Sequence, residues 1–231
     1  ISKTANFIFN IGERHTRSYD SFIGYDIPVL SFYPSISPAV AYNTEWAKTR
    51  DRNSFLCFAG NGFICKGVDL VVESFLKDPS KQLHICGPNS EKAFFKYYGS
   101  LIDKAPNIHY HGFITPGQTT FNHLASKCSF VVFHSAAEGC CTSVATAIKA
   151  GLVPIVNPWT GINIDKEGIS LKEEGNLIDN ISEAVIKASS LNNDDYQMMV
   201  DHTLKKSELF SQESFTKSYA MALDTVIRSK K

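Results

Sequence analysis

Short strand-like runs alternate with helix-like segments along most of this 231-residue chain, and this alternation restricts the fold more than any other feature. Each strand-like run is apolar and stops at glycine or polar residues, and each segment after it has apolar residues at helical spacing. We expect strands at 54–59, 82–86, 107–111, 129–134 and 153–156, and helices at 68–76, 91–104, 119–126 and 142–150. This repetition predicts a doubly wound α/β domain, a parallel sheet covered by helices on both faces.

The two ends of the chain depart from this alternation. Residues 5–10 and 28–32 are expected to form two more strands, separated by a helical stretch at 16–23. Tyr33–Asn53 is rich in Pro and Ser and favours a hinge. From about Ile181 to Arg228 the chain has only helical patterns, which predicts a helical tail.

Composition excludes several classes of protein. Lys and Arg together number 23, as do Asp and Glu, so the chain lacks the basic excess of a nucleic-acid-binding protein. No apolar run reaches the length of about 18 residues expected of a membrane-spanning helix. The six cysteines have no CxxC pair or metal-type spacing, and several lie in apolar runs. We therefore expect free thiols in a reducing cytosol and a cytoplasmic protein.

The loops after the strands are the expected ligand site, because ligands of open α/β sheets bind at the carboxyl ends of the strands. These loops are residues 60–67, 87–90, 111–114 and 134–139. The first is rich in glycine and has Lys66 near the start of the next helix, which suits a phosphate. It matches neither the Walker pattern nor GxGxxG, so a plain turn with a solvated lysine fits this loop equally well.

Five segments of the chain follow one another in a recognisable order and spacing. They are AGNGFICKGVDLVVESF, LHICGP, NIHYHGFI, FHSAAEG and AIKAGLVPIV. In that order they resemble the landmarks of the C-terminal, nucleotide-sugar-binding domain of family 4-type glycosyltransferases, which have the two-domain GT-B fold. The resemblance runs from about Ser54 to the end of the chain and implies a Rossmann-like doubly wound parallel sheet with a helical C-terminal tail.

The resemblance also implies a domain organisation. Residues 1–35 resemble the end of the N-terminal, acceptor-binding domain, 36–53 the hinge, and 54–231 the donor-binding domain. The rest of the acceptor domain would be missing, so we expect this chain alone to be inactive. Its start at Ile1, without an initiator Met or a signal-peptide pattern, favours a piece of a longer protein.

Two side chains receive catalytic roles from the resemblance. Glu138 would contact hydroxyls of the donor sugar, and Lys66 would offset the charge that grows on the leaving diphosphate. A carboxylate accepts hydrogen bonds from hydroxyls but repels phosphate oxygens, so Glu138 would point away from the diphosphate. The alternatives are a solvent-exposed loop acid for Glu138 and a surface lysine for Lys66.

The resemblance assigns donor binding mainly to backbone groups. Amides at the start of the helix near 142 would hold the diphosphate, and the strand end near 112 would support the nucleobase. The donor-binding residues implied in this way are Gly112, Phe113, Gly139, Cys140, Cys141 and Thr142. For Gly112 the alternative is simply a glycine that ends a strand.

The implied reaction moves a sugar from a nucleoside-diphosphate sugar to a hydroxyl acceptor, with retention of anomeric configuration, in glycan or polysaccharide biosynthesis. It is a hexosyltransferase-type reaction, and the acceptor would be a sugar, a lipid-linked sugar or a protein. No cofactor or metal is implied, in keeping with the absence of a DxD motif from the sequence. The enzyme would be cytoplasmic or peripheral to the inner face of a membrane.

Two positions depart from the family pattern. Thr146 stands where a second glutamate reaches the ribose, and Asn61 where an arginine joins the lysine on the diphosphate. Both still offer a neutral hydrogen bond, but charge-assisted bonds are about twice as strong. The departures leave open an alternative, a non-catalytic homologue that binds a partner transferase or a glycan.

A further alternative is a Rossmann-like domain for another nucleotide, as in an epimerase or dehydrogenase. The sequence lacks GxGxxG, and Tyr97 and Tyr98 are not followed by a lysine four residues later, which argues against this class.

The C-terminal helix has an apolar stripe that includes Phe215, Tyr219 and Leu223. In the family this helix braces the N-terminal domain. We therefore expect an exposed apolar patch here, covered by dimerisation, with an ordinary amphipathic helix as the alternative.

Overall fold

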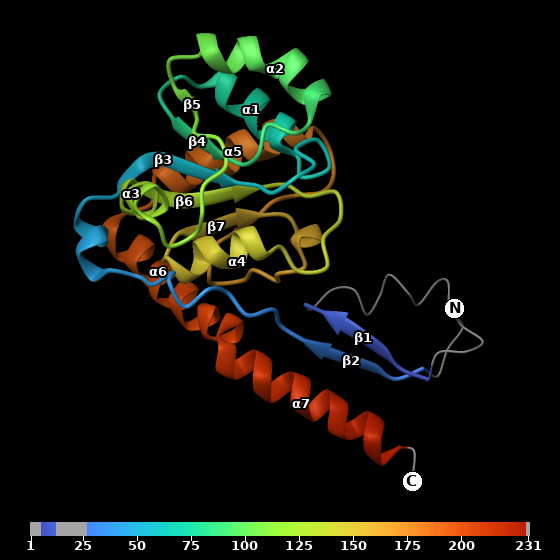
Figure 1. Cartoon of the computed structure of the whole chain (residues 1–231). Helices are drawn as coiled ribbons and strands as arrows, with labels where there is room; N and C mark the ends of the chain where they lie inside the picture. Colours follow the sequence, from blue (N-terminus) through green and yellow to red (C-terminus); the bar gives the residue numbers. More distant parts are fainter. Residues whose placement is uncertain (1–5, 13–26, 230–231) are drawn as a thin grey trace.

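The computed structural model describes residues 6–12 and 27–229, which form a six-stranded parallel sheet with helices on both faces and a separate two-stranded parallel sheet (Figure 1). The order of the large sheet is β5-β4-β3-β6-β7-β8. Its strands are β3 (Asp51–Phe58), β4 (Gln82–Cys86), β5 (Ile108–Tyr110), β6 (Cys128–Phe133), β7 (Val153–Val156) and β8 (Ile169–Ser170). The predicted doubly wound α/β fold is confirmed.

The core lies on both faces of the central strands. Every residue of β6 and β7 is buried, as expected of strands that helices cover on both faces. Phe55 of β3 stacks on Phe130 of β6 with ring centroids 5.2 Å apart. Cys57 and Cys128 are fully buried among these side chains, and all six cysteines are free thiols.

The helices divide between the two faces because right-handed crossovers that run in opposite directions along a sheet place their helices on opposite sides. One layer holds α1 (Val68–Lys77), α2 (Lys92–Lys104) and α5 (Leu177–Ser189), and the other holds α3 (Thr119–Lys127), α4 (Thr142–Lys149) and α6 (Asn193–Ser207). Within the described ranges no helix combines the length and the hydropathy that crossing a membrane requires.

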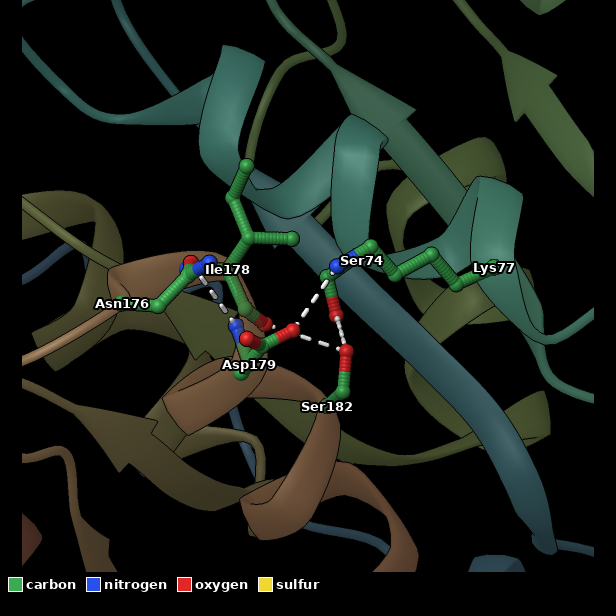
Figure 2. A network of polar contacts seen from close by, with 6 residues as sticks. All are labelled: Ser74, Lys77, Asn176, Ile178, Asp179 and Ser182. Atoms are coloured by element: carbon green, nitrogen blue, oxygen red, sulfur yellow. Dashed lines mark hydrogen bonds and ion pairs between the residues drawn. The ribbon is translucent and has the colours of Figure 1, made fainter.

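A polar network fastens α1 to α5, which lie about a hundred residues apart in the chain (Figure 2). The hydroxyls of Ser74 and Ser182 are 3.0 Å apart, and Ser182 donates to the Ile178 carbonyl at 3.0 Å. Lys77 pairs with Asp179 at 2.7 Å. The start of α5 is fixed by Asn176, whose side chain accepts hydrogen bonds from the first backbone amides of the helix.

The small sheet pairs β1 (Ile8–Ile11) with β2 (Val29–Phe32) in parallel. The last helix, α7 (Gln212–Arg228), lies along it, away from the large sheet (Figure 1). Phe32 packs edge-on against Tyr219, with ring centroids 5.2 Å apart. The predicted stripe on α7 remains partly exposed, since Tyr219 and Leu223 are 37% and 38% exposed.

Residues 36–50, which fall in the predicted hinge, are hydrogen-bonded to the large domain. The Ile36 N–H donates to the Phe210 carbonyl at 2.9 Å. Arg50 donates to the carbonyls of Ala125 and Ala150 at 3.0 and 2.6 Å. The linker is thus fastened to the sheet domain at both ends of this range.

Candidate functional site

The loops that follow β3 and β6 meet at the carboxyl edge of the large sheet. The Ala136 N–H donates to the Cys65 carbonyl at 2.9 Å. Gly67 has φ +64°, and a Cβ on it would stand 1.9 Å from the His134 carbonyl oxygen. Only glycine satisfies both the left-handed backbone and this close approach. The contact brings the loop of Lys66 against the loop of Glu138.

Lys66 and Glu138 form an ion pair across these two loops. Their side chains are each only 19% exposed. The Lys66 ammonium also lies 6.0 Å from the centroid of the Phe133 ring. A partly desolvated cation beside a carboxylate can bind an anion on one side and hydroxyl groups on the other. These are the two side chains predicted to be catalytic, and the structure brings them into contact.

The loop between Glu138 and α4 is held by the segment after β7, which includes a short 3-10 helix, η2 (Pro158–Thr160). The Glu138 N–H donates to the Trp159 carbonyl, and the Cys141 N–H to the Thr160 carbonyl, both at 2.8 Å. Among the predicted diphosphate amides, that of Cys141 therefore already has a protein partner. Gly139, Cys140 and Thr142 remain predicted amide donors.

The thiol of Cys141 is buried at the N-terminus of α4. Burial, with the nearby Glu138 carboxylate as a smaller cause, raises the pKa of Cys141 to about 12. The thiol is therefore neutral near pH 7 and adds no negative charge to this helix end. The positive end of the helix dipole next to Glu138 keeps its attraction for an anion.

The remaining predicted residues have partners of their own. Thr146 is buried on α4, and its hydroxyl donates to the Thr142 carbonyl at 2.7 Å. The Asn61 side-chain oxygen accepts from the Ser90 hydroxyl at 2.7 Å. The Gly112 carbonyl accepts from the Gly87 N–H at 2.8 Å, and Phe113 projects into solvent, 71% exposed. An exposed aromatic ring at a strand end offers a surface on which a base could stack.

Asn157 is a site residue that sequence reasoning missed. It directly follows β7 and is fully buried. Its side chain accepts from the Ser135 N–H at 3.0 Å and donates to the Ser135 carbonyl at 2.8 Å, which fixes the loop that carries Glu138. The sequence feature that could have identified Asn157 is a polar residue directly after the apolar strand 153–156. The loop after this strand was not among the loops predicted to form the ligand site.

Three imidazoles stack across the neighbouring strands β4 and β5. His84 is 97% buried, since its exposed fraction is 3%, and its ring stacks on those of His109 and His111. The His84 Nδ1 lies 2.9 Å from the His111 Nε2. Burial, with Lys127 and the neighbouring histidines as smaller causes, lowers the pKa of His84 to about 3. His84 is therefore neutral near pH 7.

Solved structures with the same arrangement of elements cover nearly the whole chain. The GtfA/B complex matches with a TM-score of 0.75 at 19% identity, over 97% of this chain and 46% of that one. HepE from Anabaena, solved with UDP and glucose, matches with a TM-score of 0.77 at 10% identity, over 97% and 64%.

A third match is sucrose-phosphate synthase from Thermosynechococcus elongatus, with a TM-score of 0.79 at 11% identity, over 99% of this chain and 60% of that one. The chain thus spans from under half to under two thirds of the length of these structures. At these identities the matches show the fold alone. No curated protein gives a significant match.

One family model matches residues 44–206, which cover most of the chain and include Lys66, Glu138 and the segments that hold them. The sequence resemblance, the sheet order and this match agree. The chain belongs to the family of glycosyl transferases group 1.

Proposed function

We propose that this chain is the donor-binding part of a retaining glycosyltransferase that moves a sugar from a nucleoside-diphosphate sugar to a hydroxyl acceptor. The observation that carries the proposal is the Lys66–Glu138 pair beside the N-terminus of α4. This arrangement combines one cation, one carboxylate and a helix dipole within a partly buried edge of the sheet. Support for the nucleotide comes from HepE, whose solved structure contains UDP and glucose.

In the proposed reaction the diphosphate leaves the anomeric carbon of the sugar and gains negative charge. Lys66 and the N-terminus of α4 stabilise that charge, because both present positive potential at fixed positions. Glu138 accepts hydrogen bonds from sugar hydroxyls and orients the ring. To reach the diphosphate, Lys66 exchanges its contact with Glu138 for one with phosphate oxygens. We assign the acceptor site to a part of the protein outside this chain. We propose glycan or polysaccharide synthesis as the class of pathway.

The phosphate role of Lys66 is tested by calorimetric titration of the chain with UDP, GDP and ADP and with the matching nucleosides. We expect a diphosphate to bind more tightly than its nucleoside, and Lys66→Ala to weaken diphosphate binding by about 10- to 100-fold, the equivalent of about 1.5–3 kcal/mol for a charge-assisted bond. The matched control is Lys96→Ala, on the exposed surface of α2. Equal affinities for nucleoside and diphosphate, or no effect of Lys66→Ala, would contradict the assignment.

A second candidate function is a non-catalytic homologue that binds a partner transferase or a glycan. The observation that favours it is that Thr146 and Asn61 use their polar groups on Thr142 and Ser90 within the protein. A site that has lost two charged groups binds its donor less tightly.

The double variant Thr146→Glu, Asn61→Arg distinguishes the two candidates. For an active transferase we expect tighter donor binding at an unchanged melting temperature, because each new charge finds its ligand group. For the non-catalytic homologue the glutamate would lie at a buried helix position without a partner, which destabilises the fold. We predict the first outcome. A lower melting temperature with no gain in binding would support the second.

A further inference from the structure

A pocket of about 260 Å³ lies next to the Lys66–Glu138 pair but does not include either side chain. Its walls come from α1, from the loop after β6, from η2 and from the segment that leads into α5. The apolar wall residues are Ile64, Leu70, Trp159 and Leu177. The contacts between α1 and α5 in Figure 2 hold two of these walls together. The helices and loops of the fold therefore form this pocket, and its shape does not depend on whether Lys66 and Glu138 stay in contact.

Two buried polar side chains line this pocket without a hydrogen-bond partner in the part of the chain that the structure describes. They are His134, through Nε2, and Ser135, through Oγ. Both residues belong to the pocket lining, but the two atoms are closed even to water in this structure, so a ligand reaches them only after the side chains turn toward the cavity. Buried polar atoms are nearly always hydrogen-bonded in native proteins, and an unpaired one costs free energy. The two atoms point to a ligand with polar groups of its own.

The protonation of His134 sets what that ligand must offer. Burial lowers the pKa of His134, while a hydrogen bond with its own backbone and the Glu173 and Asp69 charges oppose the shift, so the ring is neutral near pH 7. A neutral ring that donates to its backbone carbonyl does so from Nδ1, and this leaves Nε2 as an acceptor. Glu173 adds a carboxylate at the rim. The pocket thus presents acceptors to hydroxyl donors.

The other residues that line the pocket further restrict the class of ligand that it can bind. No Lys or Arg is among the described residues that line the pocket, and Glu173 repels anions, so phosphate does not fit. Trp159 offers an aromatic face that packs against C–H groups. The volume is slightly below the range of about 300–1,000 Å³ typical of drug-sized ligands. We propose that this pocket binds a polyhydroxyl compound of monosaccharide size, stacked on Trp159, at a site separate from that of the proposed nucleotide donor.

The chain has two tryptophans, Trp46 and Trp159, so a Trp46→Phe variant reports on the pocket by fluorescence. We expect D-glucose or N-acetylglucosamine to change the Trp159 emission saturably, with a dissociation constant in the millimolar range. In this background Ser135→Ala and Glu173→Gln should each weaken binding by about 3- to 10-fold, the usual effect of one hydrogen bond. Glu173 is exposed, so its variant remains informative if Ser135→Ala fails to fold.

Three further measurements decide the proposal. Glu138→Gln should leave sugar binding unchanged, because Glu138 is the proposed sugar contact of the donor site and does not line this pocket. Loss of sugar binding in Glu138→Gln would overturn the proposal. A saturable fluorescence response to inorganic phosphate or tetramethylammonium, without a response to either sugar, would also overturn the proposal. The absence of a response to both sugars, in a Trp46→Phe variant that melts like the parent chain, would overturn it as well.

Discussion

His84 illustrates how the environment of one residue affects the stability of the whole domain. Its ring is buried and stacks on those of His109 and His111, with Lys127 close enough to add positive potential. A proton on this ring would be both desolvated and repelled. The folded protein therefore keeps His84 neutral down to about pH 3, whereas an unfolded chain takes up the proton near pH 6.5.

This difference predicts acid sensitivity. Between pH 6.5 and pH 3 the unfolded state binds more protons at this position, so the free energy of unfolding falls as pH falls. The contribution of His84 at pH 5 is a loss of about 2 kcal/mol relative to pH 7. His84→Asn should flatten the dependence of urea-induced unfolding on pH, while the control His123→Asn, on the exposed surface of α3, should not. An unchanged slope in His84→Asn would contradict the assignment.

At the scale of single residues, the sequence predicts which side chains belong to the site better than it predicts their hydrogen-bond partners. Lys66 and Glu138 both follow strands of one parallel sheet, so their proximity follows from topology, and the structure places them in contact. The role of Asn157 depends on a pair of hydrogen bonds to Ser135 across 22 residues. No local pattern encodes such a pair. The same holds for Cys141, whose amide partner Thr160 lies on another loop.

At the scale of elements, the start of α1 depends on a single glycine. Gly67 lies at the N-cap of α1 with φ +64°, and its missing side chain lets the helix approach the loop after β6. The same glycine therefore fixes both the direction of α1 and the distance between the Lys66 and Glu138 loops.

Gly67→Ala should destabilise the protein by about 3 kcal/mol or more, because the left-handed backbone alone costs about 1–2 kcal/mol and the methyl group adds a clash with His134. Gly112→Ala is a matched control. Gly112 also has a positive φ, +69°, but nothing lies within 4 Å of the added carbon, so we expect only the backbone cost. Thermal unfolding of both variants measures the difference. Equal losses of stability in the two variants would show that the structure around His134 shifts to accommodate the methyl group without a loss of free energy.

The elements themselves were largely predictable, because alternating periodicity is a local property. The helices and strands at 68–156 match the structure to within one residue at each end, and the exceptions outside this range have physical causes. β3 begins at Asp51, earlier than expected, because the polar Asp51 pairs with Cys128 of β6 before the apolar run of β3 begins. β8 has only two residues, too few for any period, and it was missed. The helix predicted at 16–23 lies outside the described residues.

For the molecule as a whole, α7 and the small sheet form one unit through aromatic packing. The rings of Phe215 and Tyr219 stack on each other, 5.6 Å apart, and both contact Phe32 of β2. The sequence predicted the apolar stripe, and its partial exposure agrees with the structure. That the stripe is covered by dimerisation stays a prediction.

Removing these rings should release the small sheet without unfolding the large one. In the double variant Phe215→Ala, Tyr219→Ala we expect faster amide hydrogen exchange at Ile8–Ile11 and Val29–Phe32, because two strands alone are marginally stable. Exchange in β3 and β6 should not change, since their core contains neither ring. The control Met221→Ala alters an exposed side chain of the same helix. Uniformly faster exchange would mean that the two sheets unfold as one cooperative body.

The fastened linker has a consequence for movement. Ile36 is bonded to Phe210, Lys149 holds the carbonyl of Ser37, and Arg50 holds two helix ends, so the chain is anchored from residue 36 onward. The chain crosses between the two units near Tyr33 and returns near Phe210, and these two rings touch edge to face, 5.7 Å apart. The two units are therefore joined by two chain crossings that lie side by side at the Tyr33–Phe210 contact. If the small unit moves, we expect it to turn about the Tyr33–Phe210 contact and not to slide along the sheet domain, because turning leaves the hydrogen bonds of residues 36–50 intact.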